Sequence, residues 1–230
     1  MTLTRRLVKG QALTSAEHDA NIDHFEQNPN GIYIPKAQNV GIKIDETAPD
    51  WGWHDITSTM VLAGDASDPV FATYQGNIRQ LQFQEGANVD IAFHIPHDYA
   101  MGTDIFIHAH WSHASGLVTS STVTGNFEAS YAKSFDQASF SALIVLNLVG
   151  VPASNIRYQH MLVEGQLSSA SGVGGLLVTE DMEPDGMILC RMEMTASTLP
   201  VGVYPFLHEI DLHYQSTNVA TKSKAPDFWT

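Results

Sequence analysis

The feature that most constrains the fold is an alternation of apolar and polar residues along two neighbouring segments, 89–95 (VDIAFHI) and 104–111 (DIFIHAHW). The apolar positions are Val89, Ile91, Phe93 and Ile95 in the first segment, and Ile105, Ile107, Ala109 and Trp111 in the second. A period of two places each set on one face of an extended strand, because successive side chains of a strand point to opposite sides. Both segments are therefore predicted to be strands that bury one face.

Further strand-like runs follow at similar spacing, separated by clusters of Gly, Pro, Asn, Asp and Ser that favour turns. These runs are 70–74, 79–84, 121–131, 142–149, 157–167, 186–194 and 206–215. Many strands with this punctuation are typical of a sandwich or barrel. We predict an all-β fold, a jelly-roll-like antiparallel β-sandwich with a short N-terminal helix or arm. The aromatic segment 50–55 (DWGWHD) is predicted to cap the sandwich through Trp51 or Trp53.

One helix is predicted, in residues 13–27 (LTSAEHDANIDHFEQ). Thr14 and Glu17 have the spacing of a capping box, and the proline of 28–31 (NPNG) ends the segment. So short a helix is marginal alone and needs a surface to pack on. The predicted organisation is an arm with a helix in 1–31, a sandwich in 32–215 and a C-terminal tail in 216–230.

Composition argues against several classes of protein. The formal net charge of −14 disfavours non-specific binding to nucleic acid or to anionic lipid. The longest strongly apolar run, 142–151, is about half as long as a membrane-spanning helix, and no signal peptide is predicted. The single cysteine, Cys190, excludes a disulfide within the chain. Neither nucleic acid nor a membrane is therefore an expected partner.

The first ten residues are basic, whereas the rest of the chain is strongly acidic. This basic segment is either a solvated tail or an arm that docks on an acidic partner surface. In the second interpretation both ends of the chain form interfaces with neighbouring subunits. The interface residues expected there are Arg5, Arg6, Lys9, Leu13, Ile22, Phe25, Phe228 and Trp229.

Three histidines within residues 108–113 (HAHWSH) raise the hypothesis of a metal site. His108 and His110 point to the same side of an extended strand, about 7 Å apart, so their imidazoles can begin a site for Zn, Fe or Mn. Candidates for a third ligand are His94 on the preceding strand and Glu209, Asp211 and His213 on the last one.

Two metalloenzyme families resemble part of this pattern. Gly102, His108 and His110 match the first half of the cupin motif G-x5-H-x-H, but the glutamate that follows in cupins is missing from 111–116 (WSHASG). The sequence HAHW resembles the H-x-H-W strand of α-carbonic anhydrases, but their E-H-T segment and their third histidine do not follow.

The alternative is that His108 and His110 lie on the solvent or subunit face of a strand, opposite its core face. A third interpretation places them against symmetry mates at a threefold axis, where they would bind an ion or respond to pH. We adopt the outer-face interpretation and predict no catalytic residue, no metal ligand and no cofactor. His94, His108 and His110 are kept as the metal candidates.

Two segments resemble proteins of tailed bacteriophages. Residues 5–26 (RRLVKGQALTSAEHDANIDHFE) are similar to an N-terminal segment, K-G-x-x-L-T-x-A-E-x-D-A-N, of virion proteins and especially of fibres. Residues 93–113 (FHIPHDYAMGTDIFIHAHWSH) are similar to a segment of phage structural proteins in which IPHDY precedes H-x-H-W. The resemblance implies a virion component, a trimer built on a jelly roll with an N-terminal arm or helix. It transfers no catalytic residue.

Within a virion, two roles compete. A capsid decoration or cement protein would be compact and anchored by arms, whereas a tail fibre or receptor-binding spike would attach by its N-terminal segment and bind host glycan. Fibres usually carry long repetitive or coiled shafts, and this sequence contains no such region. We therefore predict a homotrimeric cement protein that stabilises the head, with the fibre or spike as the alternative and a cupin-like metal-dependent enzyme ranked below it.

The expected partners of the cement protein are further copies of the chain and the major capsid protein or other virion proteins. Its expected place is the capsid surface, after assembly in the cytoplasm of the host bacterium.

Overall fold

The structure is a computed structural model that describes residues 51–217 of the chain. The strands are β1 (Gly52–Thr57), β2 (Val70–Gln75), β3 (Ile78–Gln82), β4 (Asn88–His94), β5 (Phe106–His113), β6 (Thr122–Ala132), β7 (Ile144–Pro152), β8 (Met161–Gln166), β9 (Ser168–Ser169), β10 (Leu177–Val178), β11 (Met187–Ser197) and β12 (Pro205–Ser216). Two short 3-10 helices, η1 (Ala170–Gly175) and η2 (Thr179–Asp181), flank β10.

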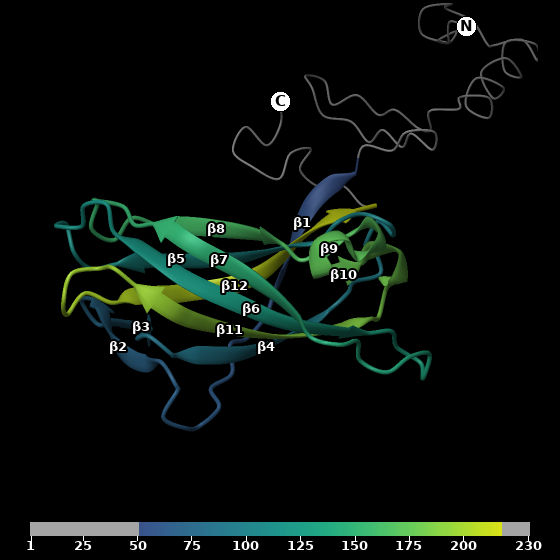
Figure 1. Ribbon diagram of the computed structural model, residues 1–230, viewed down its shortest axis with the longest axis horizontal. Coiled ribbons are helices and arrows are strands. Elements are labelled where there is room, and N and C mark those ends of the chain that lie inside the picture. Colours follow the sequence, from purple (N-terminus) through teal and green to yellow (C-terminus); the bar gives the residue numbers. More distant parts are fainter. Residues whose placement is uncertain (1–50, 218–230) are drawn as a thin grey trace, which may run out of the picture. The chain divides into compact units, whose positions relative to one another are not determined.

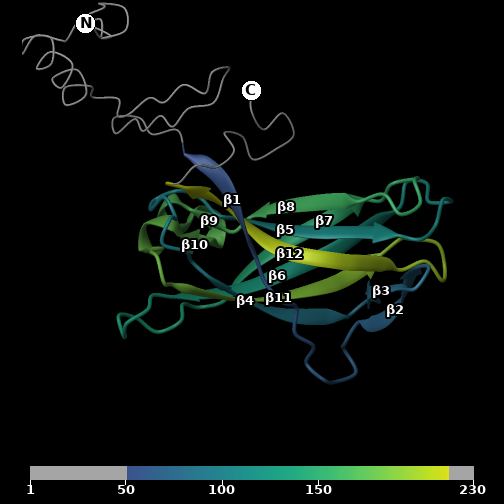
Figure 2. The same ribbon diagram turned by 180° about the vertical axis from the view of Figure 1, so that it is seen from behind.

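Ten of these strands form two antiparallel sheets. The first sheet has the order β2-β3-β12-β5-β8, with β1 also paired to β12, and the second has the order β4-β11-β6-β7. Figure 1 views the molecule from the side of β6, β7 and β11, and Figure 2 from the side of β5, β8 and β12, so that the two layers are seen in turn. The short strands β9 and β10 pair with each other in parallel.

The strand order identifies a jelly roll. Counted in chain order without β1, β2, β9 and β10, the eight remaining strands lie in the orders 1-8-3-6 and 2-7-4-5. This interleaving of two four-stranded sheets is the jelly-roll arrangement. The predicted fold class is confirmed, whereas the predicted N-terminal helix lies outside the described residues.

The core lies between the two sheets and is built from the faces that the sequence predicted. None of the eight apolar side chains at the alternating positions of 89–95 and 105–111 is more than 5% exposed. Strand β6 adds Phe127 and Ala129, which are fully buried. The core positions of these two predicted strands are therefore confirmed.

The segment 50–55 differs from its prediction, because most of it belongs to strand β1. This strand pairs with β12 from Gly52 opposite Ser216 to Thr57 opposite Asp211. The ring of Trp53 meets the ring of Phe106 edge-on at 5.6 Å between centroids, and that of His213 at 5.0 Å. Trp53 therefore covers part of the outer face of the first sheet and does not cap the end of the sandwich.

Several predictions fall outside the described part of the chain. They are the helix in 13–27, the start of the sandwich at residue 32, and the interface candidates Arg5, Arg6, Lys9, Leu13, Ile22, Phe25, Phe228 and Trp229. Within residues 51–217, no helix has the length and apolar character needed to cross a membrane.

The core predicts a large difference between two phenylalanines. Phe127 is 0% exposed in β6, whereas Phe135 is 81% exposed in the connection between β6 and β7. Phe127→Ala leaves a cavity and should lower the free energy of unfolding by about 3–5 kcal/mol. Phe135→Ala, the matched control, should change it by less than about 0.5 kcal/mol. Chemical denaturation measures both, and equal effects would contradict this description of the core.

Candidate functional site

Titratable side chains gather on the outer face of the first sheet, where four adjacent strands carry them at matching register positions. His108 of β5 lies opposite Glu164 of β8 on one side and opposite Asp211 of β12 on the other. On the far side of β12, Asp55 of β1 lies opposite His213. The register of the sheet thus brings together residues far apart in sequence. We call these five residues the His–Asp cluster.

The predicted orientation of His108 is confirmed, but its predicted exposure is wrong. The residue lies on the face opposite the core, yet only 4% of it is exposed. Its ring is edge-on to the ring of His213 at 4.8 Å and to the ring of His110 at 6.0 Å between centroids. Strand β5 lies inside the sheet and not at its edge, so neighbouring strands flank His108 on both sides.

His108 is held between two carboxylates. Its Nε2 hydrogen-bonds to Oε2 of Glu164 at 3.0 Å, and its Nδ1 lies 3.2 Å from Oδ1 of Asp211. Burial lowers the pKa of His108, but the contacts with Asp211 and Glu164 outweigh burial and raise that pKa above its ordinary value. The ring is therefore a place where positive charge is favoured.

Asp211 is buried between two imidazoles. It is 5% exposed, and its Oδ2 lies 3.1 Å from Nε2 of His110, whose Nδ1 is in turn 2.8 Å from Nε2 of His160. Burial raises the pKa of Asp211, but the contacts with His108 and His110 outweigh burial and lower the pKa to about 2. The carboxylate is therefore ionised at neutral pH. Its second oxygen, Oδ1, makes no hydrogen bond despite its short distance to His108.

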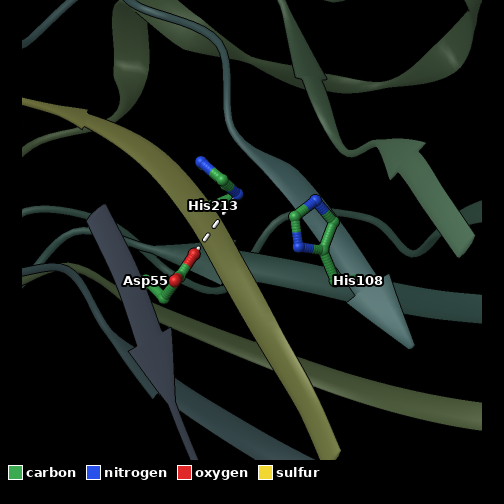
Figure 3. Close-up of side chains that lie close together, drawn as sticks. All are labelled: Asp55, His108 and His213. Carbon is green, nitrogen blue, oxygen red and sulfur yellow. Dashed lines mark ion pairs between the residues drawn. The ribbon is translucent and has the colours of Figure 1, made fainter. Parts of the chain in front are cut away.

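His213 is the least satisfied member of the cluster. It is 7% exposed, and neither of its ring nitrogens makes a hydrogen bond. Nδ1 nevertheless lies 3.2 Å from Oδ1 of Asp55, as the dashed line in Figure 3 shows. Burial lowers the pKa of His213, which favours the neutral imidazole. A neutral imidazole is the form of histidine that binds metals.

A second polar row continues along the same face toward β2. The hydroxyl of Ser112 lies 2.8 Å from the hydroxyl of Tyr74 and 2.7 Å from Nε2 of His208. A serine beside a histidine is one half of a nucleophilic arrangement. Ser112 is, however, 0% exposed, so its hydroxyl is closed to a substrate in this structure. The pair acts as a buried hydrogen-bond network.

Two sets of three residues could hold a metal ion. They are Asp55, His108 and His213, and His108, His110 and Asp211, and in each set the possible ligand atoms lie within 4.8 Å of one another. Two imidazoles and one carboxylate form the donor set of several zinc and non-haem iron sites. Figure 3 shows the side chains of the first set, which come from β1, β5 and β12.

The structure sorts the metal candidates of the sequence. His108, His110, Asp211 and His213 come together. His94 does not join them, because it lies on β4 of the other sheet, where its Nε2 is 3.2 Å from Asp185. Glu209 belongs to neither set, although it lies opposite His110 in the register of β12 and β5.

Two members of the cluster were not found from the sequence. Asp55 lies in β1, which was not predicted because the aromatic segment 50–55 was interpreted as a cap. Glu164 lies in a predicted strand, but the sequence does not show which strand is its neighbour. A period of two in 157–167 places Glu164 on one face with His160 and Gln166, but it does not say which strand lies beside it.

The depressed pKa of Asp211 predicts a contribution to stability at acid pH. The folded-state pKa of about 2 lies below the ordinary value of 3.8, so the contribution is complete above pH 4 and is lost as the pH falls toward 2. Asp211→Asn should therefore lower the free energy of unfolding at pH 7 by about 2 kcal/mol and flatten its dependence on pH in that window. The measurement is urea denaturation at several pH values.

Asp136→Asn is the matched control, because Asp136 is an exposed acid in the connection between β6 and β7. Its effect on the free energy of unfolding should be within about 0.5 kcal/mol. An Asp211→Asn variant as stable as this control at pH 7 would contradict the charge arrangement described above.

Comparison with known proteins gives only distant similarities. No family model and no curated protein matches the chain. A carbohydrate-binding module, TmCBM61 in complex with β-1,4-galactotriose, is 9% identical, with 71% of this chain and 88% of that chain covered and a TM-score of 0.28. CBM28, a module specific for non-crystalline cellulose, is 11% identical, with 79% of this chain and 94% of that chain covered and a TM-score of 0.29. Eiger TNF from S. frugiperda is 8% identical, with 76% of this chain and 91% of that chain covered and a TM-score of 0.25. At TM-scores this low, the fold assignment rests on the strand order itself.

Proposed function

We propose that the chain is a structural protein of a tailed-bacteriophage virion, a cement or decoration protein that stabilises the head as a homotrimer. The observation that carries the proposal is the place of the phage-like segment 93–113 in the fold. This segment begins in β4 of the second sheet and ends in β5 of the first. It therefore includes a crossover of the jelly roll, and jelly rolls are a common architecture of viral capsid domains.

The proposal includes no catalytic activity. Two observations support this part. The His–Asp cluster does not line two cavities that lie elsewhere in residues 51–217. One of these is an apolar space between the sheets, and the other, of about 440 Å³, lies over the second sheet and is lined by residues of β4, β6 and β11. The buried Ser112 likewise offers a substrate no access.

Strand β7 supplies a surface for self-association. It is the last strand of the second sheet, and Val145 and Val149 on its outer side are 51% and 76% exposed, beside Leu143 at 67%. Exposed apolar side chains on an edge strand favour pairing with another chain. We assign this edge to contacts between copies of the chain.

The trimer predicts a solution mass of about 76 kDa, three times 25.2 kDa, in light scattering coupled to size exclusion. Replacing Val145 and Val149 by Asp should shift the mass toward that of one chain, because burying two carboxylates in an apolar contact is unfavourable. Val201→Asp is the control, since Val201 is fully exposed in the turn between β11 and β12. A monomeric unmodified chain would contradict the trimer.

The location in the virion predicts the result of labelling. Gold-labelled antibody against the chain should mark the heads of purified particles in electron micrographs. Deleting residues 1–12 should weaken binding of the purified chain to capsids that lack it, because the basic Arg5, Arg6 and Lys9 are lost.

Two results would contradict parts of this proposal. Particles without label would exclude a virion role, and undiminished binding after the deletion would exclude docking by the arm. Label on the tail, together with purified protein that blocks phage adsorption, would instead favour a fibre or spike, which the similarity of residues 5–26 to fibre proteins supports.

A further inference from the structure

We propose that one divalent transition-metal ion binds between Asp55, His108 and His213 and fastens strand β1 to the first sheet. This inference rests on the geometry of the His–Asp cluster and is independent of the virion role. The three side chains, drawn in Figure 3, come from β1, β5 and β12, and their possible ligand atoms lie within 4.8 Å of one another.

The first argument is the orientation of His108. Its Nε2 donates to Glu164, because an ionised carboxylate can only accept a hydrogen bond. If the ring is neutral, its other nitrogen, Nδ1, carries a lone pair and no proton. This nitrogen nevertheless faces Oδ1 of Asp211 at 3.2 Å, and that oxygen receives no hydrogen bond. Two acceptors in such a position require a cation beside them. Either a second proton on His108 or a metal ion supplies this positive charge, and an experiment can distinguish the two.

The second argument is His213, which a proton on His108 does not satisfy. Both of its ring nitrogens lack hydrogen bonds although the residue is 93% buried. A buried polar group left in this state is unfavourable, because it has lost its hydrogen bonds to water without replacement. Its Nδ1 faces the carboxylate of Asp55, which is 54% exposed and so open to an ion arriving from solvent. A metal between them would bind Nδ1 of His213 and the carboxylate of Asp55 at the same time.

The third argument is distance. Zinc binds imidazole nitrogen at about 2.0–2.1 Å, so two ligands of a tetrahedral ion lie about 3.4 Å apart. Nδ1 of His213 and Oδ1 of Asp55 are 3.2 Å apart, and all ligand atoms of the set fall within 4.8 Å. The hydrogen bond from His108 to Glu164 adds the carboxylate that commonly orients a metal-binding histidine.

The other possible set, His108, His110 and Asp211, is less suited to an ion. Both ring nitrogens of His110 are already engaged, Nε2 with Asp211 and Nδ1 with His160. These contacts form a chain of hydrogen bonds that needs no metal. The set with Asp55 contains His213, whose two ring nitrogens both lack hydrogen bonds, and its Asp55 is open to solvent, so we assign the ion to it.

The role that follows is structural. The ion would join β1 to β12 and to β5, which β1 does not contact through its own hydrogen-bond ladder. Trp53 packs edge-on against His213 and Phe106 and covers the site from one side. The ion would therefore strengthen the attachment of β1 to the first sheet.

The experiment uses the full chain, stripped of metal with a chelator and then titrated with Zn²⁺ by calorimetry, and with Co²⁺ by visible absorption. We expect one ion per chain and a higher unfolding temperature in its presence. Asp55→Asn and His213→Gln should each weaken Zn²⁺ binding by about tenfold or more. Because Asp55 is half exposed, we expect Asp55→Asn to fold like the unmodified chain. Circular dichroism of the metal-free variant checks this.

The double variant His94→Ala, His97→Ala is the matched control. These two histidines share Asp185, with His–Asp distances of 3.2 and 3.1 Å, and they are 55% and 79% exposed on another part of the molecule. The control should bind Zn²⁺ like the unmodified chain.

Three results would overturn the proposal. The first is that neither Zn²⁺ nor Co²⁺ binds saturably up to about 1 mM. The second is that Asp55→Asn and His213→Gln leave Zn²⁺ binding unchanged, and the third is that the control variant no longer binds Zn²⁺. The first would show that protons alone hold the cluster together.

Discussion

The pairing of β5 with β12 in the middle of the first sheet is the interaction on which the rest of the structure depends. Ala109 lies opposite Ile210 and Ile107 opposite Leu212, and all four side chains are buried between the sheets. The same register places His108 opposite Asp211 on the outer face. A shift by one residue would exchange the two faces, because the side-chain period of a strand is two. The core therefore fixes the His–Asp cluster.

Three members of the cluster, His108, Asp211 and His213, are buried although they lie outside the core. Asp211 and His108 are each about 95% buried, and the carboxylate of the one lies beside the imidazole of the other. Removing one partner of such a pair leaves an uncompensated buried charge, which costs more than the pair contributes. This part of the sheet consequently tolerates few changes, whether a proton or a metal ion completes it.

The two sheets differ in what they present to the outside. The first buries titratable groups under Trp53 and its neighbours, whereas the second ends in β7 with exposed valines. Such a division fits a module that stabilises itself on one face and associates through the other. The proposed structural role uses this division, with the His–Asp cluster outside the two cavities described above.

The sequence by itself determined the class of the fold and the inward faces of its strands, because the alternation in 89–95 and 104–111 is local and survives without knowledge of neighbours. It also offered Asp211 and His213 as possible ligands beside His108, but together with Glu209 and His94, which belong to neither set of three. Only the tertiary structure decided that β1 exists beside β12, that Asp55 and Glu164 complete the cluster, and that His108 is covered. These facts depend on which strands are adjacent and in what register, and residues such as His110 and Asp211 meet across 101 positions of sequence. Local periodicity carries no information about such pairings, so burial of the histidines could be learned only from the assembled sheet.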